Sequence, residues 1–403
     1  MTAPDTDHRS DTKAAVAAVI QRILPEVVET RHHLHRNPEL SGQEAETSAL
    51  VAERLRAWGL DDIQTGIAGH GVTAVLRGQG DGPMLALRAD MDALPIQETA
   101  GRPYQSCRAG VMHACGHDGH TATLLGAAQV LSELRERLPG PVKFIFQPAE
   151  ETTGGAEAMV EAGVLEGVQA IVALHGWPNL DVGQIGYRPG PMMASADRFD
   201  LTVRGVGGHA GYPHLVVDPI VIGTQIVQAW QTLASREASP LDSVVVSVTQ
   251  FHAGTAYNVI PGVAELKGTV RGLSNALRDE MAGKMERIAA GLCAAFRGTY
   301  EFTYEYGPPV VVNDPGVTSL VQSVGADVLN PENVTFLETP TMGAEDFAYY
   351  LGRVPGAFFR LGVGTDVTAL HTPTYDFSDA ALPHGIAVFT HLALRFGVGH
   401  QSL

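Results

Sequence analysis

The sequence predicts an α/β protein with a largely parallel central sheet, into which a smaller α+β ferredoxin-like domain is inserted. Continuously apolar strand segments alternate with helical segments over the first part of the chain, which is typical of a parallel sheet covered on both faces. From residue 199 the expected order becomes β-α-β-β-α-β, the ferredoxin-like order. After Pro308-Pro309 helix and strand units return. The first and last parts therefore form one discontinuous domain in this prediction.

In the first part, apolar spacing and turn residues place each element. Gly59 is a signal for the end of the second helix, and Pro139-Gly140 close the long third helix. The helices are expected at 13–35, 43–58, 119–138 and 155–162, and the strands at 71–78, 83–90, 141–146 and 170–177.

The inserted domain and the return segment follow the same rules. The expected strands are 199–205, 243–252, 264–272, 299–306 and 357–364, and the expected helices are 218–235, 276–296 and 380–396. The domains are accordingly predicted to be 1–189, 190–307 and 308–403, with the first and third joined in space.

Charge and composition exclude several classes of protein. The chain has 403 residues, 27 basic and 44 acidic side chains and a net charge of −17, which argues against nucleic acid or an anionic membrane as a partner. Only three cysteines occur, so no disulfide framework is expected. The polar N-terminus lacks a signal-peptide pattern, and no apolar stretch reaches the ~18 residues of a transmembrane helix. We expect a cytoplasmic protein.

A thiol and an imidazole stand two residues apart in VMHACGHDGH, residues 111–120. Cys115 and His117 precede the expected helix at 119, on a short loop where both can converge on a metal ion. The alternative is a buried structural cysteine beside a capping histidine. Asp118 is expected to cap the helix, and His120 to lie outside the ligand set.

Two adjacent carboxylates, Glu150 and Glu151, follow the apolar run of FIFQPAEE. One can bind a metal ion while the other takes a proton from a metal-bound water. The alternative is an ordinary solvated turn. His175 lies at the end of another expected strand and His371 in a proline-containing loop, and each alone would more often be structural. Together with Cys115, His117 and a glutamate, they are enough to hold two ions.

Other polar residues are candidates for supporting roles. Asp92, two residues after Asp90 at a strand end, is expected to orient a ligating imidazole, with simple turn chemistry as the alternative. His209 lies in the glycine-rich GVGGHAGYPH, which matches no phosphate-binding fingerprint, and could donate to a developing oxyanion from a mobile loop. Asn258 and Arg271 stand at strand boundaries of the inserted domain. Arginine is the natural clamp for a carboxylate, and a surface ion pair is the alternative.

These segments together resemble the M20 metallopeptidase clan, and most of all its amidohydrolases: hippurate hydrolases, N-acyl-L-amino acid amidohydrolases and plant indoleacetyl-amino-acid hydrolases. The resemblance covers nearly the whole chain, and the combination of MHACGHD with QPAEE is highly specific. The matching strings are RHHLHRNPEL, RADMDALPIQE, GVMHACGHDGHTATLLGAA, FIFQPAEE, ALHGW, GGHAGYPH, NVIPG, MGAEDF and LHTPTYDF.

The resemblance implies a role for each candidate. Two divalent metal ions, zinc or manganese with cobalt or nickel as further options, would be bound by Cys115, His117, Glu151, His175 and His371. Glu150 would be the general base and His209 would polarise the scissile carbonyl, from its own subunit or a partner's. Asn258 and Arg271 would hold the substrate's carboxylate. The catalytic domain would resemble the zinc-peptidase fold, and the inserted domain would be a lid that mediates homodimers or higher homo-oligomers.

The leading hypothesis is hydrolysis of a small N-acyl-L-amino acid with an acetyl, benzoyl or arylacetyl group. A dipeptidase or an N-acetyl-diaminopimelate deacetylase is the alternative within the family. Outside it stand a hydrolase with Cys115 as the thiol nucleophile and a non-catalytic binding protein on this scaffold. Cys107 has no assigned role and is expected to be buried.

Overall fold

The computed structural model describes residues 4–152 and 154–398. The chain divides into two compact units. Unit 1 comprises Met1–Gly190, Val312–Thr339 and Asp346–Leu403, and unit 2 comprises Pro191–Val311 and Pro340–Glu345. The sequence predicted domain boundaries after residues 189 and 307, whereas the units divide after Gly190 and Val311. The inclusion of residues 340–345 in unit 2 was not expected. No helix in the described part of the chain is long and apolar enough to cross a membrane.

Unit 1 is built on an eight-stranded sheet with the order β1-β2-β4-β3-β5-β16-β6-β15. Its four central strands are parallel to one another and almost entirely buried, which confirms the largely parallel central sheet. They are β4 (Val142–Gln147), β3 (Met84–Asp90), β5 (Val168–Trp177) and β16 (Gly356–Gly362). The outer strands are β1 (Asp61–Ile67), β2 (Gly71–Leu76), β6 (Ile185–Tyr187) and β15 (Val334–Phe336).

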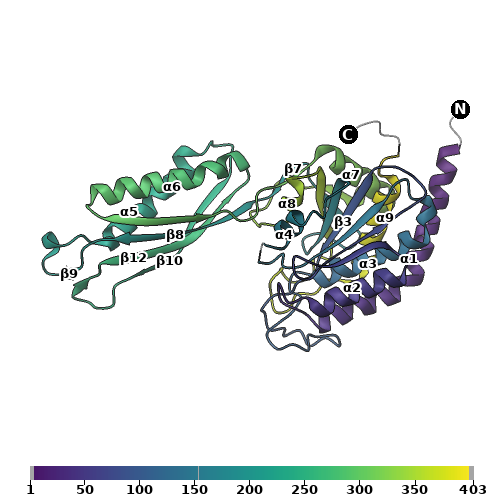
Figure 1. Ribbon diagram of the computed structural model, residues 1–403, viewed down its shortest axis with the longest axis horizontal. Coiled ribbons are helices and arrows are strands. Elements are labelled where there is room, and N and C mark those ends of the chain that lie inside the picture. The colour runs from purple at the N-terminus through teal and green to yellow at the C-terminus, as the bar shows by residue number, and fades with distance from the viewer. Residues whose placement is uncertain (1–3, 153, 399–403) are drawn as a thin grey trace. The chain divides into compact units, whose positions relative to one another are not determined.

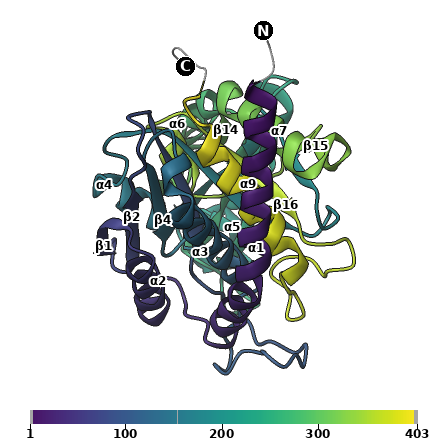
Figure 2. The same ribbon diagram turned by 90° about the vertical axis from the view of Figure 1, so that its right-hand side faces the viewer.

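Helices cover both faces of this sheet. Figures 1 and 2 show α1, α3 and α9 packed together on one face, whereas α4 and α8 pack on the other. Every residue of α3 from His117 to Leu131 is buried, so this helix forms the centre of its layer. The helices of unit 1 are α1 (Pro4–Arg36), α2 (Ala45–Ala57), α3 (His117–Glu133), α4 (Gly155–Glu161), α7 (Pro315–Leu329), α8 (Ala348–Leu351) and α9 (Leu382–Arg395).

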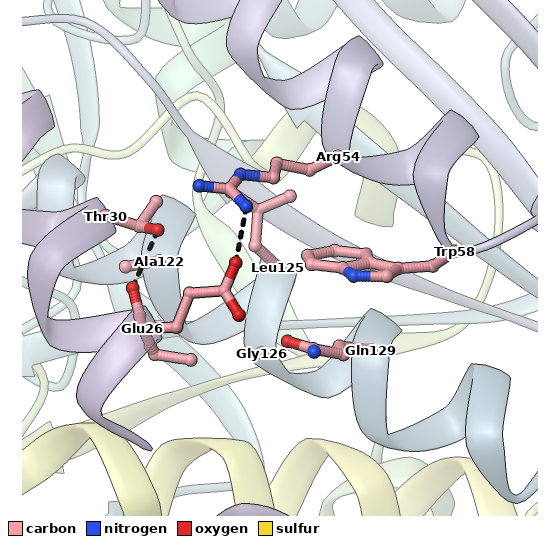
Figure 3. A pocket seen from close by; sticks show the side chains of 9 residues that line it. Glu26, Thr30, Arg54, Trp58, Ala122, Leu125, Gly126 and Gln129 are labelled. Carbon is pink, nitrogen blue, oxygen red and sulfur yellow. Dashed lines mark hydrogen bonds and ion pairs between the residues drawn. The ribbon is translucent and has the colours of Figure 1, made fainter. Parts of the chain in front are cut away.

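The contact among α1, α2 and α3 leaves only a small gap, which Figure 3 shows from close by. Arg54 of α2 forms an ion pair with Glu26 of α1, and the hydroxyl of Thr30 donates to the Glu26 carbonyl at 2.9 Å. The cavity is about 10 Å³. A volume of that size holds about one water molecule. It is a packing gap and not a ligand site.

Close packing at the start of α3 gives a stability prediction. A Cβ added at Gly119 would lie 2.3 Å from Cγ of Phe377, a fully buried ring. Gly119→Ala should therefore lower the free energy of unfolding of unit 1 by about 1–3 kcal/mol through overpacking. Differential scanning calorimetry, which can separate the transitions of two units, measures the effect.

The matched control is Gly283→Ala in the exposed part of a unit 2 helix, where an added Cβ meets nothing within 4 Å. There the loss of unfolded-state freedom should stabilise the protein by about 0.4–1 kcal/mol. A Gly119→Ala protein as stable as the original would mean that Phe377 has room to shift.

Unit 2 has the predicted ferredoxin-like order. Its four strands form an antiparallel sheet with the order β10-β12-β8-β13, and the two helices between them bury a core around Phe199, Trp230 and Met285. Asp218 and Ser274 cap the two helices with their side chains. The elements are β8 (Ser195–Arg204), α5 (Pro219–Thr232), β10 (Val244–Ala253), β12 (Val263–Gly272), α6 (Asn275–Ala295) and β13 (Thr299–Glu305).

Short strands complete the fold. In unit 2, β9 (Gly208–His209) and β11 (Val259–Ile260) form a separate two-stranded antiparallel sheet. The strands β7 (Gly190–Met193) and β14 (Val311–Asn313) form a further two-stranded pair where the chain passes between the units. These short strands, and the polar edge strand β1, were not expected from the sequence, because a few residues carry too little periodicity to be recognised.

Candidate metal centre

The candidate site lies at the carboxyl edge of the central sheet of unit 1. Asp90 is the last residue of β3, and His175 lies two residues before the end of β5. Glu150 and Glu151 follow β4 in the turn beyond Gln147, and Glu150 lies three residues past the end of the strand. The carboxyl ends of parallel strands meet at one edge, which is where ligands bind in open α/β sheets.

The five expected metal ligands gather here in two groups of three. The donor atoms of Cys115, His117 and His175 lie within 4.8 Å of one another, and so do those of Cys115, Glu151 and His371. The Cys115 sulfur belongs to both groups. It lies 3.3 Å from Nε2 of His175, and Nε2 of His371 lies 3.3 Å from Oε1 of Glu151. The arrangement can accommodate two ions that share the thiolate.

Hydrogen bonds orient the imidazole rings of His117 and His175. His117 is the first residue of α3, not a loop residue before it, and its Nδ1 lies 3.1 Å from Oδ1 of Asp92. His175 Nδ1 lies 2.8 Å from the Gly176 carbonyl, to which it donates. With Nδ1 of both rings engaged in this way, Nε2 is the atom available to a metal ion.

Asp92 is itself held in place. Its Oδ2 accepts from the hydroxyl of Ser41 at 2.6 Å and from the backbone N–H of Glu151 at 3.0 Å. One carboxylate therefore contacts the imidazole of His117 and the backbone of Glu151 at once. These contacts are what an orienting role for Asp92 requires.

Two buried atoms at the centre of the site support a cation there. Nε2 of His117 and Oε1 of Glu151 are buried and make no hydrogen bond with any residue that the structure describes. Buried polar atoms in folded proteins are almost always partnered. Divalent cations bound to the two groups of three would supply the missing interaction of each atom, so the residues present fit metal ions.

The pKa values at the site indicate an excess of negative charge. Burial raises the pKa of the Cys115 thiol, and the nearby carboxylates of Glu151, Glu150 and Asp90 raise it further. Burial alone would lower the pKa of His117, but Asp90 and the hydrogen bond to Asp92 raise it to about 10. A bound divalent cation would reverse both effects, holding the thiol as thiolate and the imidazole neutral.

Glu150 lies beside the ligands without belonging to either group of three. It is 8% exposed, and a carboxylate oxygen of Glu150 lies within 4.8 Å of the donor atoms of His117 and Glu151. The preceding Ala149 has a left-handed backbone with φ 56°, and its N–H donates to Glu44 at 2.8 Å. This turn presents the two adjacent carboxylates to one site.

A second layer of buried contacts lies behind the ligands; the sequence predicted that His120 is not a ligand, but it did not predict its partners. His120 Nδ1 lies 2.7 Å from Oδ1 of Asp90, and its Nε2 accepts from the Gly176 N–H at 2.7 Å. Arg88 donates to the same aspartate at 2.7 Å. Burial would raise the pKa of Asp90, but His117, Arg88 and His120 hold it well below its usual range. The strand alternation in LRAD directs Arg88 and Asp90 to the same side of β3, so the contact between these two residues could have been predicted from the sequence.

Two expectations about residues near the site are wrong. Asp118 does not cap α3, because it is the second residue of the helix and the capping position belongs to Gly116, which has φ 92°. Its carboxylate instead accepts from Arg31 and pairs with His35. Cys107 is exposed, not buried. Its backbone N–H donates to the Arg36 carbonyl, and this contact holds Cys107 in a surface loop. The apolar character of a cysteine side chain does not predict such an exposed position.

The remaining candidates lie in unit 2. His209 is in β9 opposite Val259 of β11, so it is held by strand pairing and not on a loop. Asn258 is adjacent, since its carbonyl accepts from Ala210. Arg271 lies near the other end of β12, eight residues beyond Val263. At about 3.3 Å per residue, it lies ~26 Å along β12 from Val263, the end of the strand that follows β11 and the His209 pairing.

Two ligand groups that share a thiol at the carboxyl edge of a parallel sheet, beside a further carboxylate, are typical of hydrolases that use paired metal ions. Comparisons agree with this class. The model of peptidase family M20/M25/M40 matches residues 86–395. The chain therefore belongs to peptidase family M20/M25/M40, which confirms the resemblance, and it is a hydrolase.

Individual relatives are similar along most of their length. N-acyl-L-amino acid amidohydrolase of Geobacillus stearothermophilus is 46% identical over 303 residues, which are 75% of this chain and 82% of the relative. N-acetylcysteine deacetylase of Bacillus subtilis is 42% identical over 369 residues, covering 91% and 96% of the two chains. Among solved structures, the Bacillus subtilis YXEP protein, described as a dinuclear metal binding peptidase from the M20 family, is 37% identical with a TM-score of 0.83, covering 93% and 98%.

Proposed function

We propose that the protein hydrolyses the amide bond of small N-acyl-L-amino acids, with two divalent metal ions bound in unit 1. One ion would be held by Cys115, His117 and His175, and the other by Cys115, Glu151 and His371. The observation that carries the proposal is the Cys115 sulfur shared by two ligand groups beside a further carboxylate. The substrate class follows from relatives named for N-acyl-L-amino acids and N-acetylcysteine.

When bound, the metal ions would polarise the amide carbonyl and lower the pKa of water at the site to about 7. The chain's own contribution is proton transfer and orientation. Glu150, next to the ligand Glu151 but outside both groups, would take a proton from water as general base and give it to the leaving nitrogen. Asp92 would hold the His117 ring through Nδ1. The burial of the site would strengthen each of these interactions.

His209 has the hydrogen-bonding state that a carbonyl-polarising residue needs. Its Nδ1 accepts from the Gly211 N–H at 3.0 Å, so the neutral ring carries its proton on Nε2. The side chain is exposed, which leaves Nε2–H able to donate to a substrate oxygen. Asn258, adjacent to it, would contact the same substrate.

The separation of Arg271 from His209 and Asn258 supports a homodimer. A distance of ~26 Å along β12 is more than a small N-acyl-amino acid can bridge. If all three residues contact one substrate, they must come from different copies of unit 2. We therefore propose that the enzyme acts as a homodimer or higher homo-oligomer through this domain, and that His209 and Arg271 at one active site belong to different subunits.

The alternative with Cys115 as a nucleophile is disfavoured by its surroundings. Reactive cysteines have lowered pKa values and sit among positive groups. Burial and three carboxylates raise the pKa of the Cys115 thiol instead. A thiol in this environment is suited to binding a cation.

A substrate panel tests the proposal. The purified protein, loaded with zinc or manganese, should hydrolyse at least one of the N-acetyl-, N-benzoyl- and N-indolylacetyl-amino acids. Treatment with a chelator should abolish turnover and readdition of metal should restore it, whereas a thiol alkylator applied to the metal-loaded enzyme should have little effect. Hydrolysis of dipeptides or N-acetyl-diaminopimelate alone would move the assignment to the alternative within the family. Chelator-resistant turnover would contradict the metal mechanism.

A further inference from the structure

The motif RHHLHRNPEL, at the end of α1, contributes no metal ligand, yet its first residue connects two parts of the metal centre. Arg31 is fully buried, and its Nε donates to Oδ2 of Asp118 at 2.8 Å. Asp118 follows the ligand His117 directly in α3. Because the pair is buried, it should hold the start of this helix in a fixed position against α1.

The other end of the same guanidinium holds the segment that follows His371. Nη2 of Arg31 donates to Asp376, and Nη1 to Oδ1 of Asp379 at 3.3 Å. We define residues 371–379 as the His371 segment. Arg31 thus joins the helix that begins with one ligand to the segment that begins with another, although 254 residues separate His117 from His371 (371 − 117).

His371 depends on its segment more than the other ligands do on theirs. Its side chain is 50% exposed, whereas those of Cys115, His117 and His175 are buried. Its backbone has a left-handed φ of 61°, and its N–H donates to the Ala114 carbonyl at 2.8 Å. A half-exposed imidazole has few packing contacts to fix it, so its position is set mainly by the backbone that carries it.

Other residues hold the His371 segment from its outer side. Arg102 donates to the carbonyl of Thr374 at 2.9 Å and pairs with Asp376 at 3.0 Å, and the Tyr104 hydroxyl donates to Asp376 at 2.7 Å. These contacts should keep the segment folded when Arg31 is changed. Only Arg31, among the residues that contact Asp376, also contacts Asp118 in the described part of the chain.

We propose that Arg31 is a positioning residue, which sets His371 relative to Cys115 and thereby determines the affinity of the Cys115–Glu151–His371 group for its metal ion. The proposal rests on the proposed function, since it assumes two ions in unit 1. It assigns Arg31 to one ion only. The other group of three has further supports that do not involve Arg31, namely strand β5 around His175 and the Asp92 contact to His117.

The test is zinc binding to the full-length protein, stripped of metal with a chelator and titrated with Zn²⁺ in a calorimeter. The original protein should bind two zinc ions. Arg31→Lys keeps the charge but loses the fork that reaches Asp118, Asp376 and Asp379 together. The substitution should lower the affinity for one of the two zinc ions roughly 10–100-fold and leave the affinity for the other unchanged. Loss of a residue that holds a metal ligand in place typically has an effect of this size. A purely structural role would lower the melting temperature and leave both affinities unchanged.

A double-mutant cycle identifies the affected ion. His371→Ala should bind one zinc ion only, and adding Arg31→Lys to it should not change the affinity of the ion that remains. If Arg31→Lys does not fold, Asp379→Asn is the substitute, because that carboxylate is part-exposed and contacts Nη1 of Arg31. The control is Arg54→Lys, whose partner Glu26 lies elsewhere on α1, and both affinities should be retained.

The outcomes separate the two proposals. If the original protein does not bind two zinc ions, the proposed function fails and this inference with it. If it binds two, and a folded Arg31→Lys protein (or Asp379→Asn protein) binds both with the original affinities, the positioning role alone is overturned. An equal loss at both ions would also overturn it.

Discussion

Glu150→Gln is expected to lower kcat by about 10²–10⁴-fold while both metal ions stay bound, because the amide has the size of the carboxylate but cannot take a proton from water. Glu150 lies outside both groups of three that share Cys115, so metal content should not change. Steady-state kinetics with the best substrate of the panel, together with elemental analysis of the same sample, measures both quantities.

The control for Glu150→Gln is Glu157→Gln, an exposed carboxylate in the first turn of α4, which should leave kcat unchanged. A Glu150→Gln protein with two metal ions and nearly full turnover would rule out this residue as the base. A protein that loses metal and activity together would instead make Glu150 a ligand.

Cys115→Ala is expected to have the second large effect, since its sulfur belongs to both ligand groups. Both ions should bind weakly, and kcat/KM should fall on the order of 10³-fold or more, which corresponds to the several kcal/mol that a metal ion supplies to the transition state. The measurement is kcat/KM at saturating zinc and at stoichiometric zinc, with metal content determined after gel filtration.

Cys115→Asp separates a bridging ligand from a nucleophile. A carboxylate is also a metal ligand and can bridge two ions, so the variant should recover both ions and part of the activity lost in Cys115→Ala. A thiol nucleophile would not be replaced in this way, and activity would stay absent. Cys107→Ser, at an exposed thiol, is the control and should behave as the original protein.

The local patterns of the sequence were enough to predict much of the fold and to single out polar residues that the structure brings together at one edge of the sheet. Apolar runs ended by Asp90 and His175 predicted parallel strands whose carboxyl ends meet, and the structure has both residues at that edge. The Cys-x-His string stands beside this edge at the start of α3, and the Glu-Glu string in the turn after β4. Because each of these signals is contained within about ten residues, they can be recognised without knowledge of the tertiary structure.

The contacts behind the ligands could not be predicted in the same way. Asp118 directly precedes the helix start expected at 119 and has the chemistry of a helix cap, but its partners Arg31 and His35 are more than 80 residues away along the chain. Likewise, nothing local to Arg31 indicates that Asp376 and Asp379 would surround it. Such buried charge networks are created by tertiary packing, and a single sequence carries no periodic signal for them. The same holds for residues 340–345, which return to unit 2 after the chain has left it.

Two cations that share one sulfur are expected at the site, held by Cys115, His117, Glu151, His175 and His371. Anomalous diffraction from crystals of the zinc-loaded protein, collected above and below the zinc edge, tests this arrangement most directly. We predict two peaks about 3.5–4 Å apart, both within about 2.3 Å of the Cys115 sulfur. A single peak in unit 1, or two peaks that do not share Cys115, would contradict a centre of two ions at these five residues.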